Sequence, residues 1–424
     1  MKYIKYSQTL VLKSFGALLA LGLTVILNKV LDEKSFGIYS YITSVMTFFS
    51  TIILFGNAKY IMAELPKTTK LYFFNERLTA IKTINILIFI VLSLAISVLY
   101  FMGINFFNTM EMIFIGIIMI ISYYLSRNKI NMSILRASNY PILSEIPELI
   151  LKPLLLIIFI YLLNLNSVEQ ILSFLLITLL TTYLIGTFLI NKNVGPIFLN
   201  FFKVSLKFNF ISKSLIVFFI ALVTILKENI IIYTMPYFLK FEFIGYFKIF
   251  SHLALLLSFG MMAVNIPQAY IISKKILTEK SDVKKHLITG LIFSLFYYII
   301  LSIVYLLFGE KIIEVLFGPQ LIQYMDLFYL MMIGQLIYIL IGPMGQVLIL
   351  SKNYSYALKS LILSFILTFL ATIVLIYFYS FKGACYAYIL NLFIVHFSFA
   401  AYSYKKLNIK PSIFYLLNNA DKKQ

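Results

Sequence analysis

Residues 83–104 read TINILIFIVLSLAISVLYFMGI, a stretch of 22 residues that contains no charged side chain. The hydrocarbon core of a bilayer is about 30 Å thick, so a transmembrane helix needs about 20 consecutive, mainly apolar residues. This stretch is long enough and apolar enough to cross a membrane. The composition of the whole chain points the same way, because 62% of its 424 residues are hydrophobic and only 12% are charged.

Similar stretches recur along the chain, separated by short connections that cannot fold as soluble domains of ordinary size. The pattern predicts an all-α integral membrane protein with about twelve transmembrane helices. We expect them at residues 10–30, 37–56, 83–104, 110–126, 142–163, 171–190, 214–235, 243–267, 286–308, 327–350, 358–379 and 384–403.

The formal net charge of +19 follows the predicted connections rather than a soluble surface. Alternate connections are rich in Lys and Arg, and the positive-inside rule assigns these to the cytoplasm. Both termini are then cytoplasmic, and the connection after 110–126 contributes Arg127, Lys129 and Arg136. The basic surplus is explained by orientation in a bilayer, so no nucleic-acid partner is predicted.

Motifs for cofactor or metal chemistry are missing from the sequence. Cys385 is the only cysteine, which excludes an intrachain disulfide. The histidines His252, His286 and His396 have no ligand spacing, and no Gly-rich phosphate loop precedes a Lys-Ser/Thr pair. We therefore expect no metal, no cofactor and no enzymatic activity.

Two short patterns occur once in each half of the chain. EKSFGIY at 33–39 pairs with EFIGYF at 242–247, and ILRASNY at 134–140 pairs with LILSKNY at 348–354. Both offsets are close to half the length of the chain. Six crossings per half would give parallel repeats, which place the substrate site between the halves.

These repeats predict a division of the chain into four parts. Residues 1–190 form a six-helix lobe, and residues 214–404 form a second one. Residues 191–213, which mix Phe and Lys, are either an amphipathic segment at the cytoplasmic interface or a plain linker. Residues 405–424 form a basic cytoplasmic tail.

Several short segments together resemble a known family. They are KSFGIYS at 34–40, LFGN at 54–57, EFIGY at 242–246, VLFGP at 315–319 and KGACYA at 382–387. In this order, on two sets of six helices, they resemble the Wzx-type O-antigen or capsular polysaccharide repeat-unit flippases. These belong to the multidrug/oligosaccharidyl-lipid/polysaccharide exporter (MOP) superfamily.

The resemblance implies a V-shaped, MATE-like transporter that works by alternating access. Its implied activity is to move undecaprenyl-pyrophosphate-linked oligosaccharide from the cytoplasmic to the outer leaflet of the bacterial cytoplasmic membrane. An O-antigen polymerase and a chain-length regulator are the implied partners. One departure concerns charge: related lipid II flippases use cavity arginines and carry two further helices, whereas this chain has only Arg77, Arg127 and Arg136. Lysine would have to bind the phosphates.

Charged residues inside a membrane are costly and mark functional sites by default. Lys227 and Glu228 lie within 214–235, and Lys13 lies within 10–30. We expect Lys13 and Lys227 to bind pyrophosphate and Glu228 to respond to an ion or proton. The alternatives are lysines that snorkel to the interface and an ion pair with another helix.

Three further residues complete the predicted site. Lys248 and His252 are four residues apart and share one helix face, which suggests a substrate contact and a proton-responsive group. Gln346 follows a predicted hinge at Gly342-Pro343 and could bind sugar hydroxyls. A hydrogen-bonded core histidine and an interhelical amide bond are the alternatives.

The residues Glu145, Glu148 and Lys152 form one stripe at the start of 142–163. We expect an ion-paired helix start at the interface rather than a binding site.

Two rival functions remain open from the sequence. An ion-coupled multidrug or metabolite exporter of the same superfamily would share the architecture. A membrane enzyme, such as a polymerase, a ligase or a glycosyltransferase, would need a large outward loop, and the longest candidates here are only 235–243 and 309–326.

Overall fold

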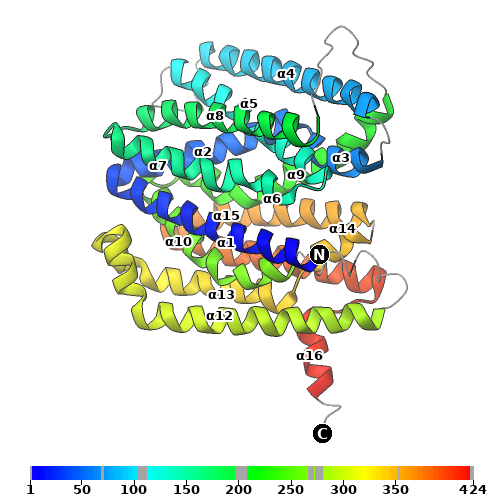
Figure 1. Ribbon diagram of the computed structural model, residues 1–424. Coiled ribbons are helices and arrows are strands. Elements are labelled where there is room, and N and C mark those ends of the chain that lie inside the picture. The colour runs from blue at the N-terminus through cyan, green and yellow to red at the C-terminus, as the bar shows by residue number, and fades with distance from the viewer. Residues whose placement is uncertain are drawn as a thin grey trace. The chain divides into compact units, whose positions relative to one another are not determined.

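The computed structural model describes residues 2–67, 71–102, 112–195, 208–265, 272, 280–351 and 353–420. Every regular element in these ranges is a helix (Figure 1). Nine helices of the described part are long and apolar enough to span a membrane, and one bent pair brings the number to ten. The predicted all-α, multi-pass membrane fold is confirmed.

Two compact units divide the chain, Met1–Ile225 and Leu226–Gln424, with the boundary inside one helix. The predicted lobes at 1–190 and 214–404 stay a prediction. Much of the linker predicted at 191–213 lies outside the described residues, as do the last four residues of the predicted basic tail.

The described residues of the first unit form eight α-helices and most of a ninth. They are α1 (Lys2–Val30), α2 (Glu33–Leu54), α3 (Asn57–Glu64), α4 (Leu71–Phe101), α5 (Met112–Ala137), α6 (Pro141–Glu145), α7 (Lys152–Leu162), α8 (Val168–Asn193) and α9 (Phe208–Thr234). A short 3₁₀ turn, η1 (Leu65–Lys67), follows α3, and a π-helical segment, η2 (Ile146–Leu151), joins α6 to α7. Within this unit α5 and α8 run side by side (Figure 1).

The second unit begins at the end of α9. Its elements are η3 (Met235–Tyr237), α10 (Phe241–Leu257), a short helix Phe259–Asn265, α12 (Lys280–Phe317), η4 (Pro319–Tyr324), α13 (Met325–Ile341), α14 (Met344–Leu350), α15 (Tyr354–Leu407) and α16 (Ser412–Ala420). Here α12 and α13 run side by side (Figure 1).

Three irregular segments of the described chain explain why about twelve predicted crossings correspond to nine unbroken helices and one bent pair. The segment α6–η2–α7 covers the crossing predicted at 142–163 in three pieces. The crossing predicted at 243–267 is bent by 54° where α10 meets Phe259–Asn265. The third case is α15, whose 54 residues are far more than one membrane thickness requires.

A tight turn divides α15 into two arms. Ser380 has φ 53° and ψ −130°, which no helix accommodates. The Oγ atoms of Ser364 and Ser398 are 3.0 Å apart, and these residues lie at similar distances along the chain on either side of Ser380. The arms therefore form an antiparallel hairpin, which matches the two crossings predicted at 358–379 and 384–403.

Gly383 permits this turn by close approach rather than by an unusual backbone angle. A Cβ atom at Gly383 would lie 1.9 Å from the backbone oxygen of Leu375. No side chain can occupy that space, because the obstacle is the backbone of the other arm.

Several predicted crossings are shorter than the observed helices: α4 begins at Leu71 rather than at residue 83, and α12 continues to Phe317 rather than ending at residue 308. The stretch at 110–126 was expected to end before a cytoplasmic connection, but α5 continues to Ala137. Arg127, Lys129 and Arg136 therefore lie on a helix within the span Ile113–Ala137. The charged residues made this segment resemble a connection, whereas neighbouring helices supply polar partners for them.

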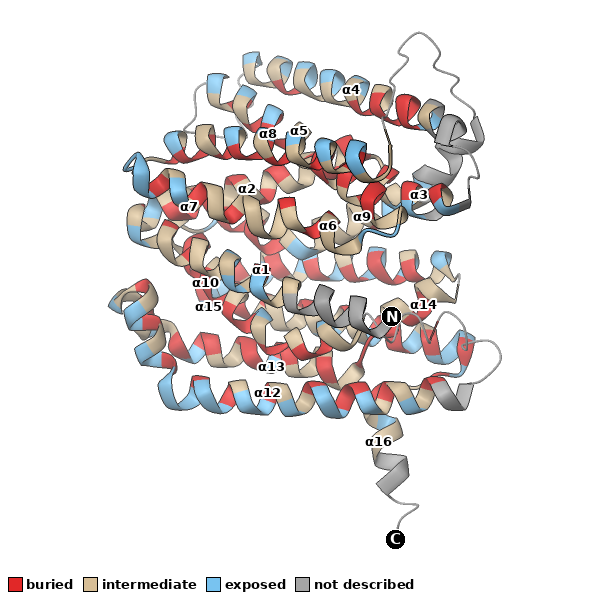
Figure 2. Cartoon of the chain, in the orientation of Figure 1, coloured by how far each residue is buried: buried red, intermediate tan, exposed pale blue. Residues whose placement is uncertain are grey.

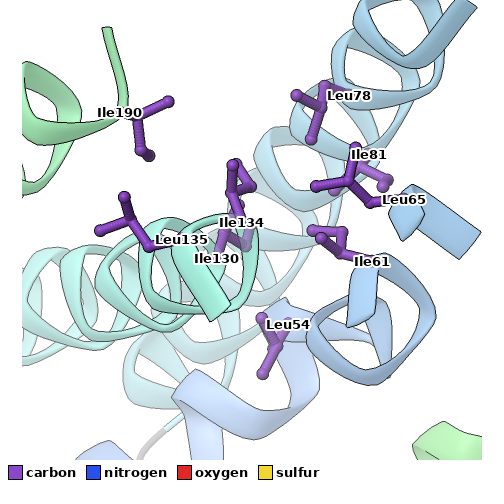
Figure 3. Packing of buried hydrophobic residues seen from close by; sticks show 9 residues of the cluster. All are labelled: Leu54, Ile61, Leu65, Leu78, Ile81, Ile130, Ile134, Leu135 and Ile190. Atoms are coloured by element: carbon purple, nitrogen blue, oxygen red, sulfur yellow. The ribbon is translucent and has the colours of Figure 1, made fainter. Parts of the chain in front are cut away.

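Burial follows the expected contrast between lipid and core (Figure 2). On α4 a stripe of large apolar side chains is exposed, which suits contact with lipid tails: Leu87, Ile90, Val91, Leu94, Val98 and Phe101. At the other end of α4, buried apolar residues of α2, α3, α4, α5 and α8 converge (Figure 3). This cluster consists of Leu54, Ile61, Leu65, Leu78, Ile81, Ile130, Ile134, Leu135 and Ile190.

Replacing Gly383 by alanine should destabilise the protein by at least about 2 kcal/mol, because overpacking a close backbone contact forces the arms apart. A thermal melt of purified protein in detergent measures the effect. Gly116→Ala is the matched control: no atom lies within 4 Å of the new Cβ, so it should be neutral or stabilising by up to about 1 kcal/mol. Equal melting temperatures for the two variants would contradict the hairpin geometry.

Candidate functional site

Unit 1 contains a group of polar side chains that come from α2, α5, η2 and α7. Lys129 of α5 donates a hydrogen bond to the hydroxyl of Ser50 on α2, at 3.3 Å. Lys152 forms an ion pair with Glu148 one turn before it. Lys129 is also within electrostatic range of both Glu148 and Lys152. We call Ser50, Lys129, Glu148 and Lys152 the lysine cluster.

The π-helical segment contains Glu148, and Lys152 follows it as the first residue of α7. Proline lacks a backbone N–H and clashes with the preceding turn, so Pro147 and Pro153 interrupt regular α-helical bonding. The backbone N–H of Lys152 bonds to the carbonyl of Pro147, five residues earlier, as a π-helix requires. Such segments are frequent at functional sites.

The lysine cluster carries more positive than negative charge. Its two ammonium groups share the single carboxylate of Glu148, whose side chain is 21% exposed. The neighbouring Glu145 cannot balance the surplus, because its Oε1 accepts a bond from Arg136 Nη2 at 2.5 Å. An arrangement of this kind can attract an anion.

A second polar group lies in unit 2. The side-chain amide of Asn391, on the second arm of α15, donates to the backbone oxygen of Lys227 at 3.2 Å. Five residues further along that arm, the ring of His396 lies against the ring of Tyr338, with centroids 4.4 Å apart and an interplanar angle of 31°. His396 is also within electrostatic range of Lys227.

The same group extends to the break in the helix between α13 and α14. Tyr338 accepts a hydrogen bond from the Asn265 amide at 3.2 Å, and Gln346 donates to the backbone oxygen of Asn265 at 3.3 Å. The side-chain oxygens of Asn265, Gln346 and Asn391 are buried and accept no hydrogen bond from the described residues. We call Lys227, Asn265, Tyr338, Gln346, Asn391 and His396 the amide network.

Lys227 and Gln346 are thus brought together in one network, whereas the other predicted residues lie outside it. Lys227 is half-buried and Glu228 is exposed, and no described residue forms an ion pair with either. Lys248 and His252 are half-buried neighbours on α10, as their spacing suggested.

Lys13 is half-buried on α1, one turn before Gly16. Gly16 packs so closely on η2 that a Cβ there would lie 2.8 Å from the Cβ of Leu149. The structure therefore places Lys13 on the helix that contacts the π-helical segment.

Sequence reasoning missed Lys129 as a site residue, because it was assigned to a cytoplasmic connection. It also treated Glu148 and Lys152 as an interfacial feature. Their ion pair was expected, but the third charged member and Ser50 come from elements distant in sequence. The two prolines that bracket Glu148 and Lys152 were the available signal.

No family model matches this sequence, and no curated protein matches it either. Solved structures do match. The lipid II flippase MurJ in an inward closed conformation has a TM-score of 0.76 at 16% identity, over 97% of this chain and 89% of that one. A MOP superfamily transporter from Pyrococcus furiosus has a TM-score of 0.66 at 12% identity, over 95% and 94%.

A third structure, of the MATE multidrug transporter DinF-BH, has a TM-score of 0.64 at 15% identity. The match covers 96% of this chain and 95% of that one. The chain has the fold of the MOP-superfamily transporters. At these identities the similarity establishes the fold, and the cargo has to be argued from the residues.

Replacing Glu148 by glutamine should destabilise unit 1, because Lys129 and Lys152 lose their shared counter-charge. Breaking a buried ion pair costs about 3–5 kcal/mol, and partial exposure of both side chains places this case near the lower end. The double variant Glu148→Gln/Lys152→Gln should recover part of the loss. Thermal melts in detergent measure both, with Glu310→Gln as a control at an exposed position. A single variant as stable as the control would contradict the shared-carboxylate arrangement.

Proposed function

We propose that this chain is a flippase that moves undecaprenyl-pyrophosphate-linked oligosaccharide repeat units across the bacterial cytoplasmic membrane. The observation that carries the proposal is the surplus of positive charge on lysines of α5, α7 and α9. Lys129 and Lys152 share one carboxylate, and Lys227 has no ion pair among the described residues. A pyrophosphate is the kind of polyanion that such groups bind.

The cargo also has a string of sugar hydroxyls that must pass the hydrocarbon layer. The amide network supports this part of the proposal, since amides can donate and accept hydrogen bonds with hydroxyl groups. Three of its side-chain oxygens accept no bond from the described residues. Polar groups buried without partners are costly, and a hydroxylated ligand would satisfy them.

Within this proposal the residues have distinct roles. Lys13, Lys227 and the lysine cluster bind the pyrophosphate, while Lys248 and Gln346 contact the rest of the cargo. Glu228 and His252 couple the cycle to an ion or proton. Lysine binds phosphate as a point charge, without the paired geometry of arginine.

The arrangement that goes with this function is two lobes of six helices in alternating access. Both termini lie in the cytoplasm, as the distribution of basic residues favours. The polymerase and the chain-length regulator implied by the family resemblance remain predictions.

An ion-coupled exporter of small molecules is the second candidate, because one observation favours it. Glu228 is an exposed carboxylate in the span Val217–Tyr237, and it forms no ion pair with a described residue. A cationic drug would, however, be repelled by the surplus positive charge of the lysine cluster. For that reason we favour the anionic cargo.

Complementation tests the proposed function. The chain is expressed in bacteria that lack their own repeat-unit flippase, and surface polysaccharide is measured with the sidedness of the lipid-linked intermediate. We expect outer-leaflet glycan to be restored. Correctly folded protein that fails with several different repeat units, yet exports a small cation, would overturn the flippase and support the exporter.

Substitution of the lysines tests the mechanism. Lys129→Gln and Lys227→Gln should each lower export at least about tenfold at equal protein levels, since a hydrogen bond to a charged group contributes about 1.5–3 kcal/mol. Lys192→Gln, at an exposed position near the end of α8, should keep export unchanged. Full export by both the Lys129 and the Lys227 variant would refute their role in binding the cargo.

A further inference from the structure

Two cations of unit 1 are buried apart from the lysine cluster. Lys82 on α4 is 7% exposed and Arg127 on α5 is 5% exposed. Both belong to membrane-spanning segments, Arg77–Phe101 and Ile113–Ala137. Arg127 is two positions from Lys129, about 200° around the helix, so it faces another side of α5.

Tyrosine side chains surround Arg127, and no carboxylate of the described residues pairs with it. Its Nη2 donates to the hydroxyl of Tyr183 at 3.3 Å. Its guanidinium lies 5.8 Å from the ring centre of Tyr123 and 5.6 Å from that of Tyr183. The other terminal nitrogen, Nη1, is buried and has no hydrogen-bond partner among the described residues.

Lys82 adds to the imbalance. It is within electrostatic range of Arg127, and the two like charges repel each other. No carboxylate of the described residues forms an ion pair with either cation. Uncompensated charges inside a membrane protein are strongly destabilising, so a counter-charge is expected.

Apolar side chains near the ends of α5 and α8 limit the access of water that could solvate these cations in place of a counter-charge. Ile81 is adjacent to Lys82, and Ile130 and Ile134 follow Arg127 by one and two turns. These three side chains, with Ile190 of α8, belong to the buried apolar cluster in Figure 3. Along α5 and α8, these residues lie between Arg127 and Tyr183, respectively, and the C-terminal ends of the two helices.

Helix α8 is held firmly against this face of α5. The amide of Asn128 donates to the Thr182 hydroxyl at 2.9 Å, and that of Asn131 donates to the backbone oxygen of Tyr183 at 3.2 Å. A Cβ at Gly186 would lie 3.1 Å from Asn131 Nδ2. These contacts hold Tyr183 in place. The Tyr183 hydroxyl is therefore positioned beside Arg127 in the absence of a ligand.

We infer that Lys82, Arg127 and the Tyr183 hydroxyl form a binding site for a phosphate group between α4, α5 and α8. The free Nη1 of Arg127 supplies a charge-assisted donor, and guanidinium groups suit phosphate oxygens. Lys82 contributes a second positive charge. This site is independent of the cargo proposed above, and its phosphate comes either from an anionic lipid headgroup or from solution.

Ligand binding to the purified full-length chain tests the site. The protein is stripped of lipid in detergent, and its melting temperature is followed during titration with phosphatidylglycerol, phosphatidylcholine or inorganic phosphate. A ligand that binds only the folded state raises the melting temperature. We expect phosphatidylglycerol or phosphate to raise the melting temperature more than phosphatidylcholine does. The anion that raises it shows whether the bound phosphate group comes from a lipid headgroup or from solution.

Variants connect the effect to these residues. Arg127→Gln and Lys82→Gln should each weaken anion binding at least about tenfold, whereas Arg127→Lys retains part of it and the exposed-site control Lys192→Gln retains all of it. If the glutamine variants do not fold, Tyr183→Phe decides, because it removes only one hydroxyl and should weaken binding severalfold. Unchanged affinity in these variants, or no stabilisation by either anion, would overturn the inference.

Discussion

The absence of water inside a bilayer is the constraint on which the rest of this structure depends. Every backbone N–H and C=O in the hydrocarbon layer needs an internal partner, so the chain can cross only as helices. Wherever a helix is interrupted, other groups must take over. At Pro147 a π-type bond from Lys152 does so, and after the break at Gly342 the hydroxyl of Ser403 donates to the backbone oxygen of Met344.

The same constraint explains where the polar side chains gather. The lysine cluster is built around the π-helical segment, and the amide network reaches the break between α13 and α14. Interruptions of this kind are tolerated at membrane depth where protein groups or a cavity surround them. In each unit, therefore, an interrupted helix lies beside a group of polar side chains.

Helix α5 organises the charges of unit 1. Three cations on this helix face three different neighbours: Arg127 meets Tyr183 of α8, Lys129 meets Ser50 of α2, and Arg136 meets Glu145 of α6. A helix with charges on several faces cannot lie against lipid on those faces. The end of its sequence consequently resembles a polar connection, which is why the crossing predicted at 110–126 stopped short of Ala137.

The sequence by itself determined the fold class, the approximate positions of the crossings and the candidate cations at positions 13, 227 and 248. These follow from local composition, because partition of a segment into a bilayer depends mainly on its own residues. Only the tertiary structure decided which cations share a carboxylate and which have none. Those contacts join residues far apart in the chain, 79 positions for Lys129 and Ser50 and 56 for Arg127 and Tyr183, and helix packing sets distances that no local pattern contains.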